Sequence, residues 1–260
     1  EASILGALAG GGNGYQAFRY GTMRPHASWI AKMRQYAAPG ANRPLPDLSA
    51  AYLGMTARLD ASGSKDGDDP ISALRARYDL DLDGTWDSSW VGVGAADVLL
   101  KTVVGPTEVG VAVRDPAGHV GYTRRRLNPG GALSSARPFL SAAAGGTVQL
   151  TVRGGPAAVG TGYVVLGTLS GTAPGTPYGG LTIPLNFDGL TTGLVQAINT
   201  PLLVNFLGTI PPGGQATARF VAPPGLLSAI PFRVLHWGVV GIDNNTIRYV
   251  TNPVGMLIQP

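Results

Sequence analysis

Glycine and proline interrupt this chain so often that long helices are excluded. They supply 39 and 21 of its 260 residues, and inside a helix a glycine costs about 1 kcal/mol relative to alanine and a proline about 3 kcal/mol. Between these residues lie short runs in which apolar and polar side chains alternate, as in a strand with one buried face. The pattern predicts a mainly β protein, with short antiparallel strands joined by many turns.

The alternating runs fall into two groups along the chain. In the first group, apolar residues share one face in each of three stretches, at 53–59, 78–82 and 109–113. The second group has one short helix candidate at 190–197 and five strand candidates, at 147–152, 163–169, 216–222, 232–241 and 247–258. A sandwich of about seven to nine strands fits the length of the second group. We therefore predict two antiparallel β-sandwich domains in tandem.

Shifts in composition divide the chain into three parts. Residues 1–50 begin glycine-rich, continue with a short helix candidate that follows Pro25, and end in a proline-rich, extended linker at 43–47. Residues 51–129 contain an acidic cluster, whereas residues 130–260 carry few charges. We expect an N-terminal arm with a short helix and linker, then a first sandwich at 51–129 and a second at 130–260.

The first sandwich contains motifs that follow one another in a recognisable order. DASGSKD at 60–66, YDLDLDGTWD at 78–87 and VGVAVRDPAG at 109–118 are spaced over some 60 residues. In order and spacing they resemble the motifs of PKD-type domains, and the resemblance extends over about 51–128. It implies an immunoglobulin-like β-sandwich in which residues 78–82 form a strand.

Two further resemblances concern the ends of the chain. The segments 155–175, 180–188, 208–224 and 250–258 resemble a β-rich C-terminal module of secreted planctomycete and myxobacterial proteins, which implies secretion. Residues 10–34 resemble the end of the catalytic domain of IgA-peptidase-like zinc metallopeptidases. The zinc-binding HExxH motif of those enzymes is not in this chain, so that resemblance implies that a segment upstream supplies the metal ligands.

The stretch YDLDLDGTWD offers the main candidate site. Asp79, Asp81 and Asp83 have the alternate spacing of a calcium loop, and Asp87 follows four residues later. In an extended strand, however, side chains two residues apart lie about 6.8 Å from each other, too far to share one ion whose oxygen ligands lie at about 2.4 Å. A hairpin that turns at Asp83 and Gly84 is therefore the alternative interpretation.

Calcium also fits a second arrangement, at the end of that strand. There Asp83 or Asp87 would meet the acidic turn that contains Asp66 and Asp68. The candidate calcium ligands of the sequence are therefore Asp79, Asp81, Asp83, Asp87, Asp66 and Asp68. Calcium is the only cofactor that we expect.

Residues typical of catalytic sites are sparse. The chain has no cysteine, which excludes disulfides and thiolate zinc sites, and no G-x-S-x-G motif. Its histidines are far apart: we expect His26 and His119 at the surface and His236 half-buried in a strand. We find no catalytic motif in this chain.

Aromatic residues and one asparagine pair allow binding or structural roles. Trp86, Trp90 and Tyr178 could stack on sugars, or they could fill core and edge positions of the sheets. Asn244-Asn245-Thr246 has the pattern of a glycosylation site, and we interpret it as a turn.

Net charge and hydropathy limit the classes of partner that the chain could bind. The net charge is +4, but the basic residues are scattered and their one run, Arg124 to Arg126, is too short to follow a phosphate backbone, so we do not expect nucleic acid as a partner. The chain contains no run of 18 or more apolar residues, the length that a membrane-spanning helix requires.

We expect a non-catalytic, extracellular protein that acts in binding, spacing or assembly, at a bacterial cell surface or in a secreted fibre. Its partners would be other copies of itself or a surface polymer. The alternative is the C-terminal accessory region of a processed, secreted zinc metallopeptidase.

Overall fold

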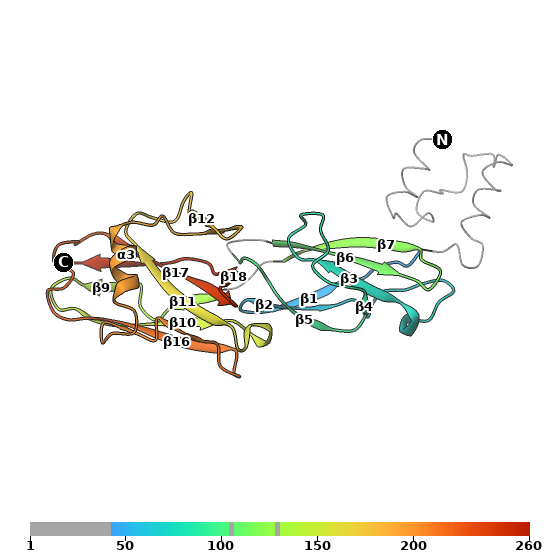
Figure 1. The fold of residues 1–260 in the computed structure, drawn as a ribbon, viewed down its shortest axis with the longest axis horizontal. Coiled ribbons are helices and arrows are strands. Elements are labelled where there is room, and N and C mark those ends of the chain that lie inside the picture. Colours follow the sequence, from blue (N-terminus) through green and yellow to red (C-terminus); the bar gives the residue numbers. More distant parts are fainter. Residues whose placement is uncertain (1–42, 104–106, 128–130) are drawn as a thin grey trace, which may run out of the picture. The chain divides into compact units, whose positions relative to one another are not determined.

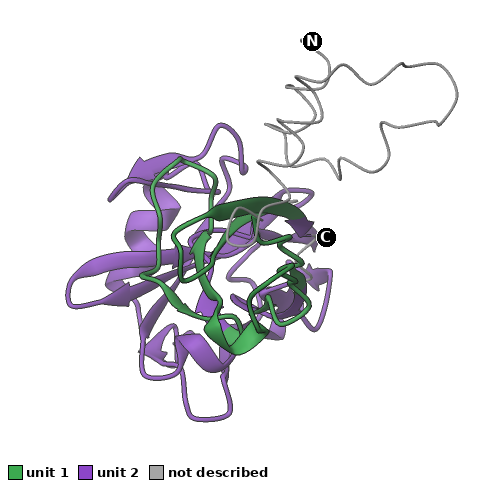
Figure 2. Cartoon of the chain, turned by 90° about the vertical axis from the view of Figure 1, so that its right-hand side faces the viewer, with its two compact units in different colours: residues 1–49, 59–96, 108–125 green, residues 50–58, 97–107, 126–260 purple. Residues whose placement is uncertain are grey.

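The computed structural model describes residues 43–103, 107–127 and 131–260, which are mainly β with one short α-helix (Figure 1). The structure divides into two compact units (Figure 2). Unit 1 contains residues 59–96 and 108–125 and the described residues before Ala50, and unit 2 contains residues 50–58, 97–107 and 126–260. The mainly β class is confirmed. The predicted arm and the helix after Pro25 lie outside the described residues.

Unit 1 is built on a four-stranded sheet with the order β4-β3-β6-β7. Its strands are β3 (Arg75–Asp79), β4 (Val91–Gly92), β6 (Thr107–Arg114) and β7 (Val120–Leu127). Strand β3 is antiparallel to β6, with Tyr78 opposite Val111. The inner face of the sheet is almost free of solvent and carries Ala76, Tyr78, Val109, Val111 and Val113. The face predicted for residues 109–113 is thus confirmed.

A second sheet has the order β1-β2-β5, and its residues are divided between the two units. Its strands are β1 (Ser49–Leu53), β2 (Thr56–Asp60) and β5 (Ala96–Leu99). The single strand predicted for 53–59 is wrong, because Gly54, with φ of 69°, turns the chain between β1 and β2. Leu53 is therefore half exposed, whereas Met55 and Leu59 are fully buried.

The proline-rich segment before β1 is not a free linker. It is extended as predicted, but Leu45 forms an antiparallel bridge with Lys65, with N···O distances of 2.7 and 3.0 Å. Pro44 is buried, and its carbonyl oxygen lies where a side chain on Gly121 of β7 would have to be. The segment thus belongs to unit 1, and the glycine in β7 allows it to approach closely.

Unit 2 contains two larger sheets. The first has the order β14-β16-β10-β8, and the second has the order β15-β11-β17-β19-β9, with β18 paired to β17. The strands of the first are β8 (Leu133–Ser135), β10 (Gly146–Arg153), β14 (Leu203–Val204) and β16 (Gln215–Ala222). Those of the second are β9 (Phe139–Ser141), β11 (Gly162–Thr168), β15 (Leu207–Thr209), β17 (Val234–Asp243), β18 (Thr246–Val250) and β19 (Val254–Gln259). A hairpin of β12 (Thr176–Tyr178) and β13 (Leu181–Ile183) completes the unit.

Aromatic packing joins the two sheets of unit 2 into a sandwich. Trp237 of β17 is fully buried, and its ring centroid lies 5.3 Å from that of Phe220 on β16, in the facing sheet. Phe206 adds an edge-to-face contact with Trp237 at 5.4 Å. Such pairs contribute about 0.5–1.5 kcal/mol beyond the area that they bury. The core of this unit therefore centres on Trp237.

Local signals in the second half of the chain correspond well to the structure. The helix candidate at 190–197 is α3 (Gly189–Gln196), and Asn244 and Asn245, both with positive φ, make the predicted turn between β17 and β18. The candidate strand 247–258, however, is two strands, β18 and β19. Strand β19 runs parallel to β9.

Candidate functional site

Three aspartates gather where β3 ends. Asp79 is the last residue of β3, and the loop that follows folds back so that Asp81 and Asp87 each bring a carboxylate oxygen within 4.8 Å of the others. The loop is held by its own hydrogen bonds: the Leu80 N–H donates to Asp87 at 2.7 Å, and the Asp87 N–H donates to the Tyr78 carbonyl at 2.9 Å. We call Asp79, Asp81 and Asp87 the loop group.

Asp79 is the buried member of the loop group. Its residue is 5% exposed. One carboxylate oxygen, Oδ2, accepts a hydrogen bond from the Gly84 N–H at 3.2 Å, whereas the other, Oδ1, is buried without a hydrogen-bond partner. A buried acceptor that lacks a partner costs about 1–3 kcal/mol, and more when it is charged. A bound cation would supply the missing partner.

The geometry of the loop differs from both sequence interpretations. The strand interpretation is wrong beyond Asp79, because β3 ends there and Leu82 has a positive φ of 55°. The objection that a strand cannot place several aspartates on one ion therefore does not apply. Asp83 lies outside the loop group, and its side chain instead accepts a hydrogen bond from the Thr85 N–H at 2.7 Å.

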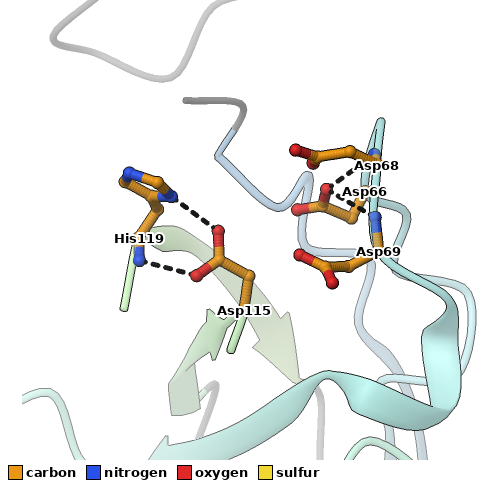
Figure 3. Close-up of polar contacts among 5 residues, drawn as sticks. All are labelled: Asp66, Asp68, Asp69, Asp115 and His119. Carbon is orange, nitrogen blue, oxygen red and sulfur yellow. Dashed lines mark hydrogen bonds and ion pairs between the residues drawn. The ribbon is translucent and has the colours of Figure 1, made fainter. Parts of the chain in front are cut away.

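A second acidic group lies in the turn before β3 (Figure 3). It consists of Asp66, Asp68 and Asp69, which we call the turn group; the sequence had pointed to the first two but not to Asp69. Asp66 Oδ1 accepts hydrogen bonds from the N–H groups of Asp68 and Asp69 at 3.1 and 3.3 Å, and its Oδ2 is buried without a hydrogen-bond partner. Burial, followed by the neighbouring Asp68, raises the pKa of Asp66 above the usual value.

The two groups share a chemical character. Among the described residues, the buried carboxylate oxygens without a hydrogen-bond donor are those of Asp66 and Asp79, one in each group. All their ligand atoms are carboxylate oxygens, which hard cations such as calcium prefer. Both groups could therefore bind such an ion. They are separate sites in the structure, so the predicted meeting of Asp83 or Asp87 with the turn of Asp66 is not among the acidic groupings of the described residues.

A histidine and an aspartate close the turn between β6 and β7 (Figure 3). His119 donates its backbone N–H to Asp115 Oδ1 at 2.8 Å, and its ring Nδ1 lies 2.7 Å from Asp115 Oδ2. Asp115 is 3% exposed, and the side chain of His119 is 35% exposed. His119 is partly exposed at the surface, as expected, and one carboxylate binds both its backbone N–H and its ring Nδ1 and thereby fixes the turn.

The other histidine in the described residues is His236, on β17. It is half-buried as expected, and burial lowers the pKa of its ring. His26 lies outside the described residues.

In unit 2, Asp188 is the most heavily hydrogen-bonded carboxylate. It caps α3 by accepting from the Thr191 N–H at 2.9 Å, and its other oxygen accepts from Thr168, Leu169 and Ser170. Burial by itself would raise the pKa of Asp188, but these hydrogen bonds outweigh it and hold the pKa well below the usual range. Sequence reasoning missed this residue, although Asp188 and Thr191 have the spacing of a capping box.

The two tryptophans considered for sugar stacking, Trp86 and Trp90, lie outside the core. Both are half-buried, and the guanidinium of Arg77 lies over both rings, at 4.1 and 4.5 Å from their centroids. Tyr178, on β12, is 65% exposed.

Comparisons with known proteins give structural likenesses alone. No protein-family model and no curated protein matches the chain. The PKD1 domain of Vibrio anguillarum Epp is 19% identical with a TM-score of 0.27, over 34% of this chain and 93% of that chain. The PKD1 domain of the Vibrio cholerae metalloprotease PrtV is 14% identical with a TM-score of 0.26, over 34% and 96%. A segment of two fibronectin type III domains from chicken tenascin is 12% identical with a TM-score of 0.27, over 84% and 99%.

At such identities and TM-scores these likenesses carry no inference about function, and the fold class rests on the strands described above. The described residues contain no helix of the length and hydropathy that a membrane span requires.

Proposed function

We propose that this chain is a non-catalytic, extracellular β-sandwich protein that acts in binding, spacing or assembly. One observation carries the proposal: the carboxylates are engaged with backbone N–H groups and so organise loops. Eight aspartates accept such bonds, namely Asp60, Asp66, Asp79, Asp81, Asp83, Asp87, Asp115 and Asp188. Acids used in this way fix the turns of a scaffold, whereas an acid–base catalyst has to be positioned towards a substrate.

We further propose that calcium stabilises unit 1 by binding the loop group. The buried, unpartnered Oδ1 of Asp79 supports this, because a cation would offset the cost of burying it. The ion would neutralise like charges that the fold brings together, and it would fix the loop between β3 and β4. Calcium would thus act as a structural ion.

The partners of such a protein would be other copies of itself or a surface polymer, and its location would be outside the cell. A PKD-type domain at about 51–128 is part of the same proposal. The alternative, an accessory region of a zinc metallopeptidase, rests on residues 10–34, which lie outside the described residues, and it stays a prediction.

The first experiment measures the molar mass of the native protein by light scattering, with calcium and with a chelator. A large assembly would support a fibre or surface layer, and a monomer would support a spacer or binding module. Incubation with casein and with polysaccharides checks the non-catalytic role. D115N changes the carboxylate that contacts the ring of His119. Turnover of casein or of a polysaccharide by the wild-type protein, if it is lost in D115N, would overturn the non-catalytic role.

The calcium site has its own test. Excess calcium should raise the melting temperature of unit 1 in the wild-type protein, and D79N should lose most of that response. D83N is the matched control, since Asp83 lies in the same loop but outside the loop group. An equal loss of response in both variants, or none in either, would contradict the assignment.

A further inference from the structure

The outer face of the β4-β3-β6-β7 sheet is basic and aromatic. In β3 the buried Ala76 and Tyr78 alternate with Arg75 and Arg77, which therefore point to the opposite, outer face. The register places Arg75 opposite Arg114 of β6. The same face carries Arg124 of β7, whose guanidinium lies 3.9 Å from Glu108.

Two tryptophans contact two of the arginines of this face, Arg77 and Arg114. The guanidinium of Arg77 lies over the rings of both Trp86 and Trp90, and Arg114 lies over Trp90 at 4.5 Å from its centroid. Tyr122 makes an edge contact with Trp86, at a centroid distance of 6.2 Å. We call this surface, made of Arg75, Arg77, Arg114, Arg124, Trp86 and Trp90, the arginine–tryptophan face.

The glycine at position 110 of β6 leaves room for this layer. A side chain there would meet the Tyr122 hydroxyl at 2.6 Å and Leu82 at 3.0 Å. Tyr122 and Leu82 therefore lie directly on the sheet, and Tyr122 is still 52% exposed. The Tyr122 ring thus lies against the sheet at Gly110 and contacts the edge of Trp86.

The charges of the face are poorly balanced by acids. Among the described residues, no carboxylate forms an ion pair with Arg75, Arg77 or Arg114, and the contact of Arg124 with Glu108 is long and exposed. Asp79 also belongs to this face by register, but it is 5% exposed and is covered by the loop. Nη1 of Arg75 donates to the Ser72 and Leu74 carbonyl oxygens. A ligand anion would therefore meet the remaining donors of Arg75, and those of Arg77 and Arg114, without competition from a paired carboxylate.

We infer that the arginine–tryptophan face binds a linear acidic polysaccharide, through its carboxylate or sulfate groups. Guanidinium groups present paired N–H donors that match both anions. The rings hold the guanidinium groups of Arg77 and Arg114 in place, so that less side-chain freedom of these two residues is lost on binding. The surface is a sheet face rather than a closed pocket, which suits an extended chain of repeating charge. The inference rests on the proposed binding function and names the chemistry of its ligand.

The test measures binding of the full-length, calcium-loaded protein to immobilised polymers. Polygalacturonate supplies carboxylates, dextran sulfate supplies sulfates, and dextran of the same length is neutral. We expect binding to one or both acidic polymers, weakened by salt, and none to dextran. R75Q/R124Q, which leaves the stacked residues in place, should lose about tenfold in affinity, because two charge-assisted contacts are removed.

The matched control removes the same charge from unit 2. R219Q/R248Q changes two exposed arginines on β16 and β18 and should change affinity less than about twofold. Because R75Q/R124Q could alter folding, R77K is a second variant: it keeps the charge, loses the planar stacking group, and should weaken binding while the melting temperature is followed in parallel.

Three results would overturn the inference: no binding to either acidic polymer, equal losses in R75Q/R124Q and R219Q/R248Q, or tighter binding to duplex DNA than to the polysaccharides. The failure of this inference is distinguishable from that of the proposed function. If polymers do not bind but the protein assembles with itself, the ligand assignment is wrong and the non-catalytic role stands. Enzymatic turnover would instead contradict the proposed function.

Discussion

At the scale of single residues, Asp66 offers a test of the turn group. Burial and the nearby Asp68 raise its pKa, so the charged form is disfavoured in the folded state, and the free energy of unfolding falls as pH rises from the unfolded value of about 3.9 through the folded pKa. We expect D66N to raise the melting temperature at pH 7 in a chelator, because the amide keeps the acceptor oxygen and removes the repulsion. The gain should shrink in excess calcium. A lower melting temperature in the chelator would contradict this account.

Asp188 should behave in the opposite way. Because its pKa is held below the unfolded value of about 3.9, its contribution to stability is complete above that value and is lost as pH falls towards the folded pKa. We expect D188N to be less stable than the wild-type protein at pH 7, with a difference that shrinks below about pH 4. Thermal unfolding between pH 2 and 7 measures this, and a difference that does not depend on pH would rule it out. An asparagine can still cap α3, so the effect reports the charge.

At the scale of elements, the segment before β1 should depend on Gly121 of β7. An alanine there would overlap the Pro44 carbonyl oxygen, and overpacking of this kind costs about 1–3 kcal/mol. We therefore expect G121A to lower the free energy of unfolding by that amount and to increase hydrogen exchange at Leu45. G92A on β4 is the control, because its added methyl group meets no atom within 4 Å. Equal effects of the two substitutions would show that the close approach contributes nothing.

The sequence predicted elements wherever local pattern decides the structure. Alternation located β6, β10 and β16, and turn chemistry located Asn244-Asn245. It failed where an irregular loop begins: Leu80 and Leu82 continue the alternation of β3, yet the chain leaves the sheet at Asp79 and folds back through the hydrogen bonds of Asp87. For the same reason the acidic residues were recognised but their grouping was not, because a loop that folds back has no periodic signature.

At the scale of the whole molecule, the predicted boundaries of the two domains still have to be tested. The sequence placed a boundary at 129–130, whereas unit 2 also contains residues 50–58 and 97–107. Thr56 explains why: it is fully buried, donates to the Gly154 carbonyl at 2.8 Å and accepts from the Ala157 N–H at 3.0 Å. A fragment that begins at residue 130 lacks these contacts.

We therefore expect the fragment 130–260 to be less stable than unit 2 of the full chain. T56V should reproduce part of the loss, about 1–3 kcal/mol, because valine keeps the shape but leaves the buried Gly154 carbonyl and the partly buried Ala157 N–H unpaired. T182V on β13 changes an exposed threonine and should stay within about 0.5 kcal/mol. Hydrogen exchange at the amides of β10 reports on unit 2 in all four proteins. If protection in the fragment equals that in the full chain, residues 130–260 fold alone and the sequence boundary is correct. Faster exchange in the fragment and in T56V would instead assign Thr56 and its neighbours to the structural unit that follows them.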